Sequence, residues 1–378
     1  MSTMVYHVSD AIISPLGFDS QTTFTAVAQG ATALRAHLFP DGQTAMAAKL
    51  DTLQEALLSA MVTQEQYSKF ERLCIVATQQ ALAQTDVDIT DKETLIILST
   101  TKGNIEWINH EEKKELLPLH ISAQRIAAFF KHPNPVQCVS VACISGVAAQ
   151  IMAKRLLQVK RYRHAVIIGC DIVSDFVRAG FSSFQALSPE QCIPFDAARK
   201  GLNLGEAAAC LILSREASLA SETAVLGGGS ISNDANHLSG PSKTGAELAL
   251  AITKSMKEAG TNPTDIGFVS AHGTATNYND EMEAKAISLA SLQNTPVNSL
   301  KCYFGHTLGA SGLLESIISL KAMEENVLLP ILHFGHSNTS VPINIISKKE
   351  QQTIDHFVKT AAGFGGCNAA VVWSKIPS

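Results

Sequence analysis

Short, uniformly apolar runs alternate with longer helical stretches along most of this chain. The apolar runs predict strands, and their uniform character is typical of sheets covered by helices on both faces. These predicted strands are 94–99, 136–141, 165–169, 207–213, 267–270, 295–299 and 369–373. The predicted helices are 65–84, 144–158, 245–259, 280–292 and 312–326. The alternation therefore favours a layered α/β fold over an all-α or all-β fold.

The best place to divide the chain lies near residue 222. A polar, helical stretch at 214–221 ends there, and a new strand-like segment begins at Ala224 and runs into three glycines. A second strand-like segment, 4–13, precedes a Ser-Pro-Leu-Gly turn and resembles a counterpart at the start of the chain. We therefore expect two halves, 1–222 and 223–378, and a weak internal duplication.

Composition argues against several classes of protein. With 46% hydrophobic and 17% charged residues, the chain is typical of a compact globular protein. Its apolar runs are far too short for a membrane span and its N-terminus lacks signal-peptide features, so we expect a cytoplasmic location. The net charge of −5 argues against nucleic-acid binding. Eight irregularly spaced cysteines without a C-x-x-C pair predict reduced thiols and no metal site.

Cys143 lies where an apolar run meets a helical pattern, in the stretch V-S-V-A-C-I-S-G-V. This arrangement predicts a strand-to-helix elbow with the cysteine at its tip. The unpaired N–H groups at a helix N-terminus favour a thiolate, so Cys143 can serve as a nucleophile. The alternative is a packing residue, because free cysteines are among the most buried residue types.

Two histidines favour the chemical interpretation of Cys143. His272 follows the predicted strand 267–270, and His306 follows the predicted strand 295–299, 34 residues later. Active sites of α/β proteins collect at strand ends, so adjacent strands can bring both imidazoles to the thiol. A thiolate can store an acyl group, while two neutral imidazoles can stabilise an enolate or oxyanion. This combination suits carbon–carbon bond formation on thioesters.

Five motifs in the same order resemble the β-ketoacyl-ACP synthases of the thiolase superfamily, most closely the elongating, decarboxylative condensing enzymes. They cover the chain nearly continuously from about residue 137, whereas the compact region 1–90 resembles the family only in outline. The motifs are V-A-C-I-S-G-V around Cys143, P-F-D-A-A-R-K-G-L-N-L-G-E-A-A-A from Pro194, A-H-G-T-A-T-N-Y-N-D-E-M-E-A from Ala271, N-S-L-K-C-Y-F-G-H-T-L-G-A-S-G-L-L-E from Asn298 and G-F-G-G-C-N-A from Gly363.

The resemblance implies a thiolase-like fold, with two similar βαβαβαββ halves in five α-β-α-β-α layers. It implies that Cys143 accepts the acyl chain, and that His272 and His306 assist decarboxylation of a malonyl thioester and hold the enolate. The backbone N–H groups of Cys143 and Phe364 would form the oxyanion hole, and Phe364 would also gate the site. The remaining implied residues are Lys301 and Glu315, which would orient His306 and a nearby loop by charge-assisted hydrogen bonds, and Thr274, Thr276 and Gly365 on the substrate path.

The resemblance also implies partners. Substrates would arrive on the phosphopantetheine of acyl carrier protein, with no cofactor of the enzyme's own, and the chain would form a homodimer or a heterodimer with a related ketosynthase. A basic group near the end of the helix after Cys143 is one candidate surface for this acidic carrier, although a solvated helix end explains it equally well. The group comprises Lys154, Arg155, Lys160, Arg161 and Arg163.

Other interpretations stay open at this point. A chain-length partner of a ketosynthase heterodimer would replace the cysteine, and a priming synthase resembles a Cys-His-Asn pattern instead. A non-decarboxylating thiolase would use a second cysteine, and Cys367 lies near that position within the G-F-G-G-C-N turn. Departures from the family pattern at Ala275, Ala361 and Ala362 leave substrate preference open, including the choice between fatty acid and polyketide pathways. Asp234 and His237 resemble a motif at the entrance of related enzymes.

Overall fold

The computed structural model describes residues 3–40, 42–220, 224–236, 238 and 240–376 of the 378-residue chain. Within them, a ten-stranded array has the order β11-β10-β14-β15-β9-β1-β8-β6-β4-β5. Its first five strands along the chain are β1 (Tyr6–Ile13), β4 (Thr94–Ser99), β5 (Gln137–Val139), β6 (His164–Asp171) and β8 (Ala207–Ser214). The other five are β9 (Ala224–Asn233), β10 (Phe268–Ser270), β11 (Val297–Asn298), β14 (His356–Gly363) and β15 (Cys367–Lys375).

The remaining strands form two small sheets. These are β2 (Arg35–Leu38), β3 (Thr44–Ala48) and β7 (Leu204–Gly205) in one, and β12 (Val327–Leu328) and β13 (Glu350–Gln351) in the other. The α-helices are α1 (Ser20–Ala28), α2 (Thr52–Met61), α3 (Lys69–Leu82), α4 (Leu119–Phe129), α5 (Ser145–Gln158), α6 (Asp175–Ser183), α7 (Ala246–Ala259), α8 (Asn277–Leu289), α9 (Lys301–Phe304) and α10 (Ser311–Glu324). Capping boxes at Asp51 and Ser68 fix the first turns of α2 and α3.

Two groups of five strands within the array have matching topology. The order β1-β8-β6-β4-β5 runs through two antiparallel and then two parallel pairings, and β9-β15-β14-β10-β11 repeats the same sequence of pairings. An antiparallel contact between Tyr6 and Val225 joins the two groups. The repeated topology agrees with an internal duplication. The predicted division at 222/223 lies outside the described residues, so it stays a prediction.

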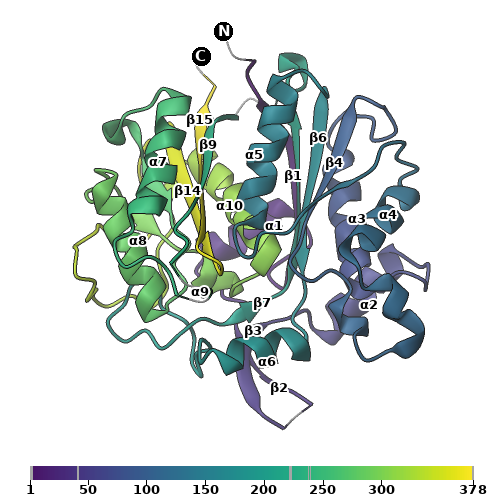
Figure 1. Cartoon of the computed structure of the whole chain (residues 1–378), viewed down its shortest axis with the longest axis horizontal. Helices are drawn as coiled ribbons and strands as arrows, with labels where there is room; N and C mark the ends of the chain where they lie inside the picture. The colour runs from purple at the N-terminus through teal and green to yellow at the C-terminus, as the bar shows by residue number, and fades with distance from the viewer. Residues whose placement is uncertain (1–2, 41, 221–223, 237, 239, 377–378) are drawn as a thin grey trace.

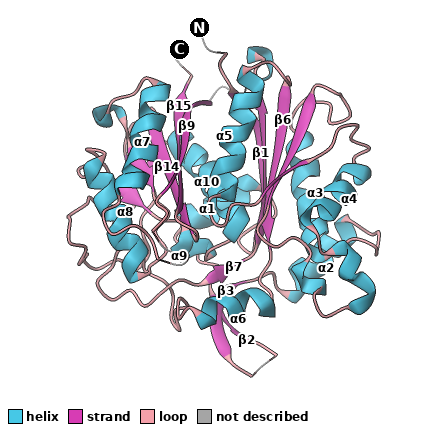
Figure 2. Ribbon diagram, viewed as in Figure 1, coloured by secondary structure: helices cyan, strands magenta, loops and turns pink. Residues whose placement is uncertain are grey.

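Helices and sheets alternate in five layers (Figures 1 and 2). α3 packs on β1, β8 and β6, and α7 packs on β9 and β15. Between the two groups of strands lie α5 and α10, each of which contacts strands from both groups. The strands β4, β6 and β8 are buried along their whole length, as expected for sheets covered on both faces. The predicted five-layered α/β fold is confirmed.

The two central helices touch through their backbones. A Cβ atom on Gly146 of α5 would lie 2.7 Å from the nitrogen of Leu313, and one on Gly312 of α10 would lie 2.8 Å from the nitrogen of Val147. Gln150 bridges the crossing, because its Nε2 donates to the Gly312 carbonyl at 3.1 Å. The close approach brings the first turns of α5 and α10 together. The segments that precede both helices are therefore neighbours.

All five predicted helices and all seven predicted strands occur; the predicted strand 94–99 coincides with β4, and the other elements begin or end at different residues. The predicted strands 136–141 and 295–299 shrink to the three residues of β5 and the two of β11. The stretch 214–221, predicted as helical, contains only the short 3₁₀ turn Ala217–Leu219 within its described part. β14 was not predicted, because Lys359 interrupts its apolar run. The helices α1, α2, α4, α6 and α9 and the strands of the two small sheets were not predicted either.

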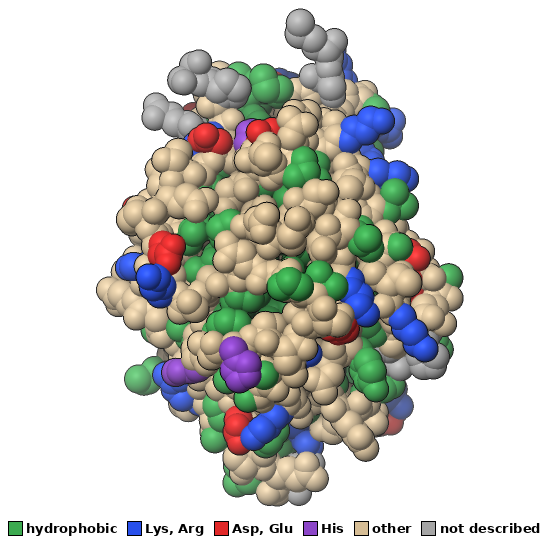
Figure 3. Space-filling model, turned by 90° about the vertical axis from the view of Figure 1, so that its left-hand side faces the viewer, with side chains coloured by type: hydrophobic (Ala, Val, Ile, Leu, Met, Phe, Trp, Pro, Cys, Tyr) green, Lys and Arg blue, Asp and Glu red, His purple; other side chains and the backbone are tan. Residues whose placement is uncertain are grey.

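No helix in the described residues has both the length and the apolar character that a membrane crossing requires. Figure 3 shows the face that carries α7 and α8, where hydrophobic side chains lie scattered among other groups, and most charged side chains lie towards the margins. Among the exposed apolar residues of these two helices are Leu250 and Leu289. This face carries no dense cluster of basic side chains.

Candidate active site

Cys143 lies between β5 and α5, on the elbow that the sequence predicts. Ala142 adopts a positive φ of 45°, which turns the chain sharply between strand and helix. The Oγ of Ser145 stabilises the turn by donating to the Ala142 carbonyl at 2.6 Å and accepting the Val141 N–H at 2.8 Å. Cys143 is thereby fixed two residues before the first helical residue of α5.

His272 follows the last residues of β10, and its backbone is held from the outer face of the sheet. The carboxylate of Glu283 on α8 accepts the N–H groups of His272 at 2.8 Å and Gly273 at 2.7 Å. Thr360 on β14 adds a third bond, because its Oγ1 accepts the His272 N–H at 3.1 Å. These partners fix the chain where the histidine leaves the strand.

His306 lies between α9 and α10, and the motif that begins at Pro194 holds its backbone. The His306 N–H donates to the carbonyl of Asn203 at 2.7 Å, and the N–H of Gly205 donates to the carbonyl of His306 at 3.1 Å. The Oδ1 of Asn203 accepts the N–H of Cys192 at 2.7 Å, which anchors this segment in turn. The motif that begins at Pro194 therefore holds the backbone of His306 in place.

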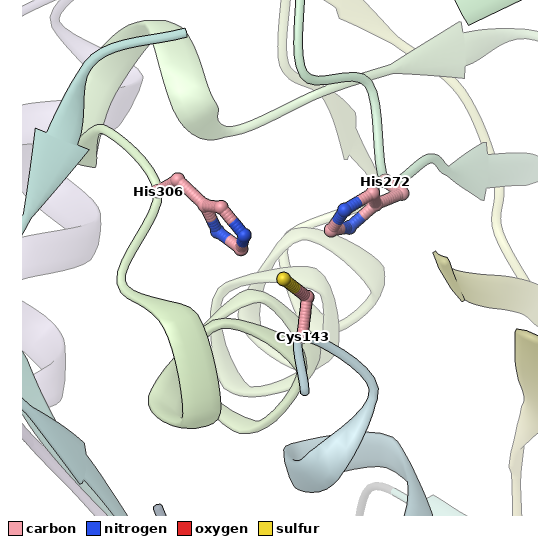
Figure 4. A group of neighbouring side chains, drawn as sticks. All are labelled: Cys143, His272 and His306. Atoms are coloured by element: carbon pink, nitrogen blue, oxygen red, sulfur yellow. The ribbon is translucent and has the colours of Figure 1, made fainter. Parts of the chain in front are cut away.

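The side chains of Cys143, His272 and His306 point toward one another (Figure 4). The cysteine sulfur and one nitrogen from each ring lie within 4.8 Å of one another. The two imidazole rings meet edge to face, with their centroids 5.2 Å apart. All three residues are buried. The structure thus brings together three residues that lie far apart in the sequence.

All three side chains are neutral near pH 7. Burial raises the pKa of the Cys143 thiol to about 12, against the opposing effect of Lys301. Burial and then Lys301 lower the pKa of His306 to about 3, and burial and Lys301 also hold the pKa of His272 well below its usual value. The expectation of a resting thiolate is therefore not supported, because desolvation outweighs the influence of the helix N-terminus.

The same three side chains offer a ligand set for a soft metal ion such as Zn²⁺. However, the thiol would first have to lose its proton, and both Lys301 and Lys359 disfavour added positive charge at the imidazoles. The electrostatics of the site therefore suit a neutral substrate carbonyl that gains negative charge better than they suit a cation.

A cavity of about 390 Å³ connects these residues with the surface. Cys143, His272 and His306 lie at its buried end, and Thr274 and Thr276 also line it, whereas their contact with a substrate stays a prediction. Its exposed lining includes Phe184, Lys200, Leu238 and Tyr278. A long, narrow substrate arm could enter past these residues and reach the thiol.

Comparison with known families agrees with this geometry. The family model described as "Beta-ketoacyl synthase, N-terminal domain" matches residues 35–218, and the one described as "Beta-ketoacyl synthase, C-terminal domain" matches residues 223–335. Together these matches span most of the chain. The chain belongs to the β-ketoacyl synthase family. This synthase is thus an acyltransferase that forms carbon–carbon bonds.

Relatives with curated names are polyketide β-ketoacyl synthases and 3-oxoacyl-[acyl-carrier-protein] synthases. A protein of Streptomyces cyaneus named as a polyketide beta-ketoacyl synthase is 27% identical, with 96% of this chain and 95% of the relative covered. The 3-oxoacyl-[acyl-carrier-protein] synthase 2 of Coxiella burnetii is 25% identical, with 97% of each chain covered. The synthase of the same name from Mycobacterium leprae is 31% identical over 61% of this chain and 59% of the relative.

Solved structures show the same fold. A chain from the complex of a ketosynthase with its chain length factor from Xenorhabdus doucetiae has a TM-score of 0.85 and 25% identity, covering 99% of this chain and 98% of that one. A β-ketoacyl synthase from Burkholderia phymatum has a TM-score of 0.88 at 23% identity, with both chains fully covered. The second likeness bears on the fold alone.

The predicted gate, Phe364, lies over the cavity of this synthase. Its ring stacks on Phe181 at a centroid distance of 5.7 Å and contacts Phe184 at 5.2 Å. The gate turn also approaches the nucleophile, because a Cβ on Gly363 would lie 3.0 Å from the nitrogen of Cys143. This proximity suits the predicted oxyanion hole, whose role stays a prediction. Gly365 does not line the cavity and donates its N–H to Leu238, so its substrate contact also stays a prediction.

The departures from the family pattern differ in their access to substrate. Ala362 lines the cavity, whereas Ala275 and Ala361 do not. Ala275 is fully buried with a positive φ of 61°, and its carbonyl accepts the N–H of Gly201. Of these three positions, only Ala362 can influence the substrate directly. Asp234 lies at the cavity, while His237 lies outside the described residues.

Lys301 and Glu315 form a buried ion pair beneath the histidines, with Nζ 2.8 Å from Oε1. The predicted hydrogen bond from this pair to the His306 ring is absent, since neither ring nitrogen has a partner within the described structure. A second lysine, Lys359, contacts the other carboxylate oxygen of Glu315 at 2.5 Å. The role of Lys359 was not predicted from the sequence. The available signal was a lysine inside an apolar run that leads into the G-F-G-G turn.

The basic group after Cys143 is not one exposed patch. Lys154 is buried and pairs with Glu258 on α7, and Arg163 lies among Asp91, Glu93 and Glu216. These residues also lie at or beyond the far end of α5 from Cys143, which spans roughly 21 Å at about 1.5 Å per residue. The structure therefore favours the interpretation of a helix end that neighbouring acids neutralise.

Proposed function

We propose that this β-ketoacyl-[acyl-carrier-protein] synthase uses Cys143 to hold an acyl chain, and His272 and His306 to condense it with a malonyl thioester. One observation carries the assignment: a thiol and two neutral imidazoles converge at the buried end of an open cavity. Neutral imidazoles donate hydrogen bonds to a thioester oxygen without a proton having first to be removed or added.

The first half-reaction exchanges one thioester for another. The Cys143 sulfur attacks the carbonyl of the acyl thioester, the bond to the pantetheine sulfur breaks, and that sulfur takes the cysteine proton. Backbone N–H groups of Cys143 and Phe364 would stabilise the tetrahedral oxyanion. The products are the acyl-enzyme and a free pantetheine thiol.

The second half-reaction forms the carbon–carbon bond. The malonyl thioester loses CO₂, and the electron pair of the broken bond becomes an enolate whose oxygen accepts hydrogen bonds from His272 and His306. The enolate carbon attacks the Cys143 thioester, the carbon–sulfur bond breaks, and the cysteine thiolate regains a proton from water. A negatively charged enolate oxygen is costly in an apolar cavity unless hydrogen-bond donors face it. The two buried imidazoles supply these donors and so favour formation of the enolate.

We expect the acyl carrier protein to dock at the cavity mouth beside Lys200. Lys200→Glu should raise the KM for a carrier-bound substrate roughly fivefold, or about 1 kcal/mol, and leave the rate with a small soluble thioester unchanged. Lys160→Glu, on the rejected basic surface, is the matched control and should change neither value. Equal loss with Lys160→Glu would move the docking surface to the end of α5.

We also propose a dimer, either of two identical chains or with a related ketosynthase subunit. The Xenorhabdus structure pairs a ketosynthase with a chain length factor, which supports the second arrangement. The presence of Cys143 and both histidines supports the catalytic role for this chain in such a pair. The choice between fatty acid and polyketide substrates depends on the acyl pocket.

We also propose that the enzyme is cytoplasmic, and its eight unpaired cysteines support this location.

An acylation assay tests the assignment. The protein is incubated with acyl-carrier thioesters of several chain lengths, and its intact mass is measured. The wild type should gain the acyl mass, and Cys143→Ala should not. His306→Ala should still be acylated but should condense about a hundredfold more slowly. Acylation of Cys143→Ala would refute the nucleophile, and equal loss of both steps in His306→Ala would refute the division of roles.

A further inference from the structure

Lys359 is a fully buried lysine whose ammonium group has three partners. Its Nζ lies 2.5 Å from Oε2 of Glu315 on α10. It also donates to the carbonyls of Ser270 at 3.2 Å and Ala271 at 3.1 Å. These two carbonyls belong to the residues immediately before His272. Lys359 therefore connects the central helix α10 with the chain that leads to one catalytic imidazole.

The position of Lys359 on β14 explains how it reaches this place. Neighbouring residues of a strand project to opposite faces of the sheet. Lys359 reaches the central layer, whereas Thr360 reaches the outer layer and donates to Glu283 on α8 at 2.6 Å. Glu283 and Thr360 hold the N–H of His272 from the outer face. Lys359 holds the preceding carbonyls from the inner face, so the strand end is clamped from both sides.

We propose that Lys359 is a positioning residue for the condensation step, because it ties the carbonyls of Ser270 and Ala271 to Glu315 and so keeps His272 in place opposite His306. The proposal rests on the function proposed above. Acylation of Cys143 does not require His272 to meet a second substrate, whereas decarboxylation and condensation do. Loss of the clamp should therefore affect the second half-reaction selectively.

The charge of Lys359 gives the proposal a second readout. His272 faces Lys301, His306 and Lys359, with Glu283 at its backbone, and His306 faces Lys301, Glu315 and Lys359. Burial, Lys301 and, to a smaller extent, Lys359 lower the pKa of both imidazoles. Removing the Lys359 ammonium should raise both pKa values, so that the imidazoles become protonated at a higher pH than in the wild type.

Lys359→Met tests this proposal, because methionine has a similar length without the charge. The variant should acylate Cys143 within about twofold of the wild type but condense about tenfold to a hundredfold more slowly. An NMR titration of the histidines should also show both imidazoles of the variant protonating at a higher pH than in the wild type. Lys154→Met is the matched control, since it removes another buried, ion-paired lysine. That control should change neither the ratio of the two steps nor the titration of the two imidazoles.

Each outcome decides the matter. Equal losses in both steps, or imidazole titrations like those of the wild type, would overturn the role of Lys359. If Lys359→Met and Lys359→Gln both fail to fold, Thr360→Val carries the test, because it removes the bond from the His272 N–H to Thr360 and leaves the bond to Glu283 in place. That variant should show the same selective loss of condensation, and unchanged condensation would overturn the proposal. Failure of the wild type to acylate or condense would instead refute the proposed function.

Discussion

The thiol and both imidazoles of the site are uncharged near pH 7, although charged side chains lie close to them. Glu315 stands between two lysines, and burial would raise its pKa, yet Lys301 and Lys359 together lower it to about 2. Glu315 therefore stays ionised while the thiol and both imidazoles stay neutral. The sequence predicted Cys143, His272 and His306 because strand-end positions and residue chemistry are visible in it. The contacts of Lys359 could not be predicted, because they join β14 to α10 and to the end of β10.

The neutral imidazoles predict an unusual pH profile. With the pKa of His306 at about 3 and that of His272 well below 6.5, both rings remain neutral as the pH falls from 8 to 5. The single-turnover rate at which preformed acyl-enzyme reacts with malonyl carrier should therefore stay nearly constant over this range. A loss of rate with a midpoint near 6.5 would show that an imidazole titrates normally.

Glu315→Gln should destabilise the protein strongly. It leaves two buried ammonium groups beside an uncharged amide, so the free energy of unfolding should fall by about 3–5 kcal/mol. In the wild type, the lowered pKa means that the stabilisation is present above pH 4.5 and is lost as the pH falls through about 2. Urea unfolding at pH 7 measures the change. Glu111→Gln breaks an exposed pair with Lys114 and should have little effect; a similarly small effect of Glu315→Gln would contradict the prediction.

Among the elements, α5 and α10 decide where the chemistry occurs. Both begin with a Ser-Gly pair, and the glycines let the helices touch beside the segments that carry Cys143 and His306. The two helices were predicted because each has a continuous helical pattern. Their contact was not predicted, since a crossing depends on space between elements and leaves no periodic signal. β14 was missed for a related reason: its lysine is compensated by partners on α10 and β10.

Gly146→Ala tests the helix crossing. The added methyl group would meet the backbone nitrogen of Leu313, which has little freedom to move, so the free energy of unfolding should fall by about 1–3 kcal/mol. Condensation should slow as well, because α5 carries the elbow of Cys143. Gly180→Ala in α6 is the control: nothing lies within 4 Å of its added methyl, and it should be neutral or slightly stabilising. Equal free energies of unfolding for the two variants would show that α5 and α10 cross less tightly than the structure indicates.

At the scale of the whole molecule, the two groups of strands place the site between them, and one edge of the array stays open. β5 pairs with β4 on one side, and its other side has no partner within the described structure. The carbonyl of Val139 points to β4, where it accepts the N–H of Thr100 at 3.3 Å. The N–H of the neighbouring Cys138 therefore faces the open edge. In the sequence, the two matching halves were indicated only by a strand-like segment near the start of each, at 4–13 and from Ala224.

The open edge leads to a test of the proposed dimer. Cys138→Pro removes the outward N–H, so it should shift the protein from dimer to monomer in sedimentation velocity if a second chain pairs with β5. Cys138→Ser keeps the N–H and should remain a dimer. A wild-type protein that sediments as an active monomer would refute the dimer, and an intact Cys138→Pro dimer would place the interface elsewhere.

The double clamp around the end of β10 has a consequence for hydrogen exchange. The N–H groups of His272 and Gly273 belong to a connecting segment, where exchange with solvent deuterium is usually fast. Here, both N–H groups donate to a fully buried carboxylate, and one of them also donates to a buried hydroxyl. These two amides should therefore exchange as slowly as the core strands, so that a catalytic loop reports the global opening of the molecule rather than local motion.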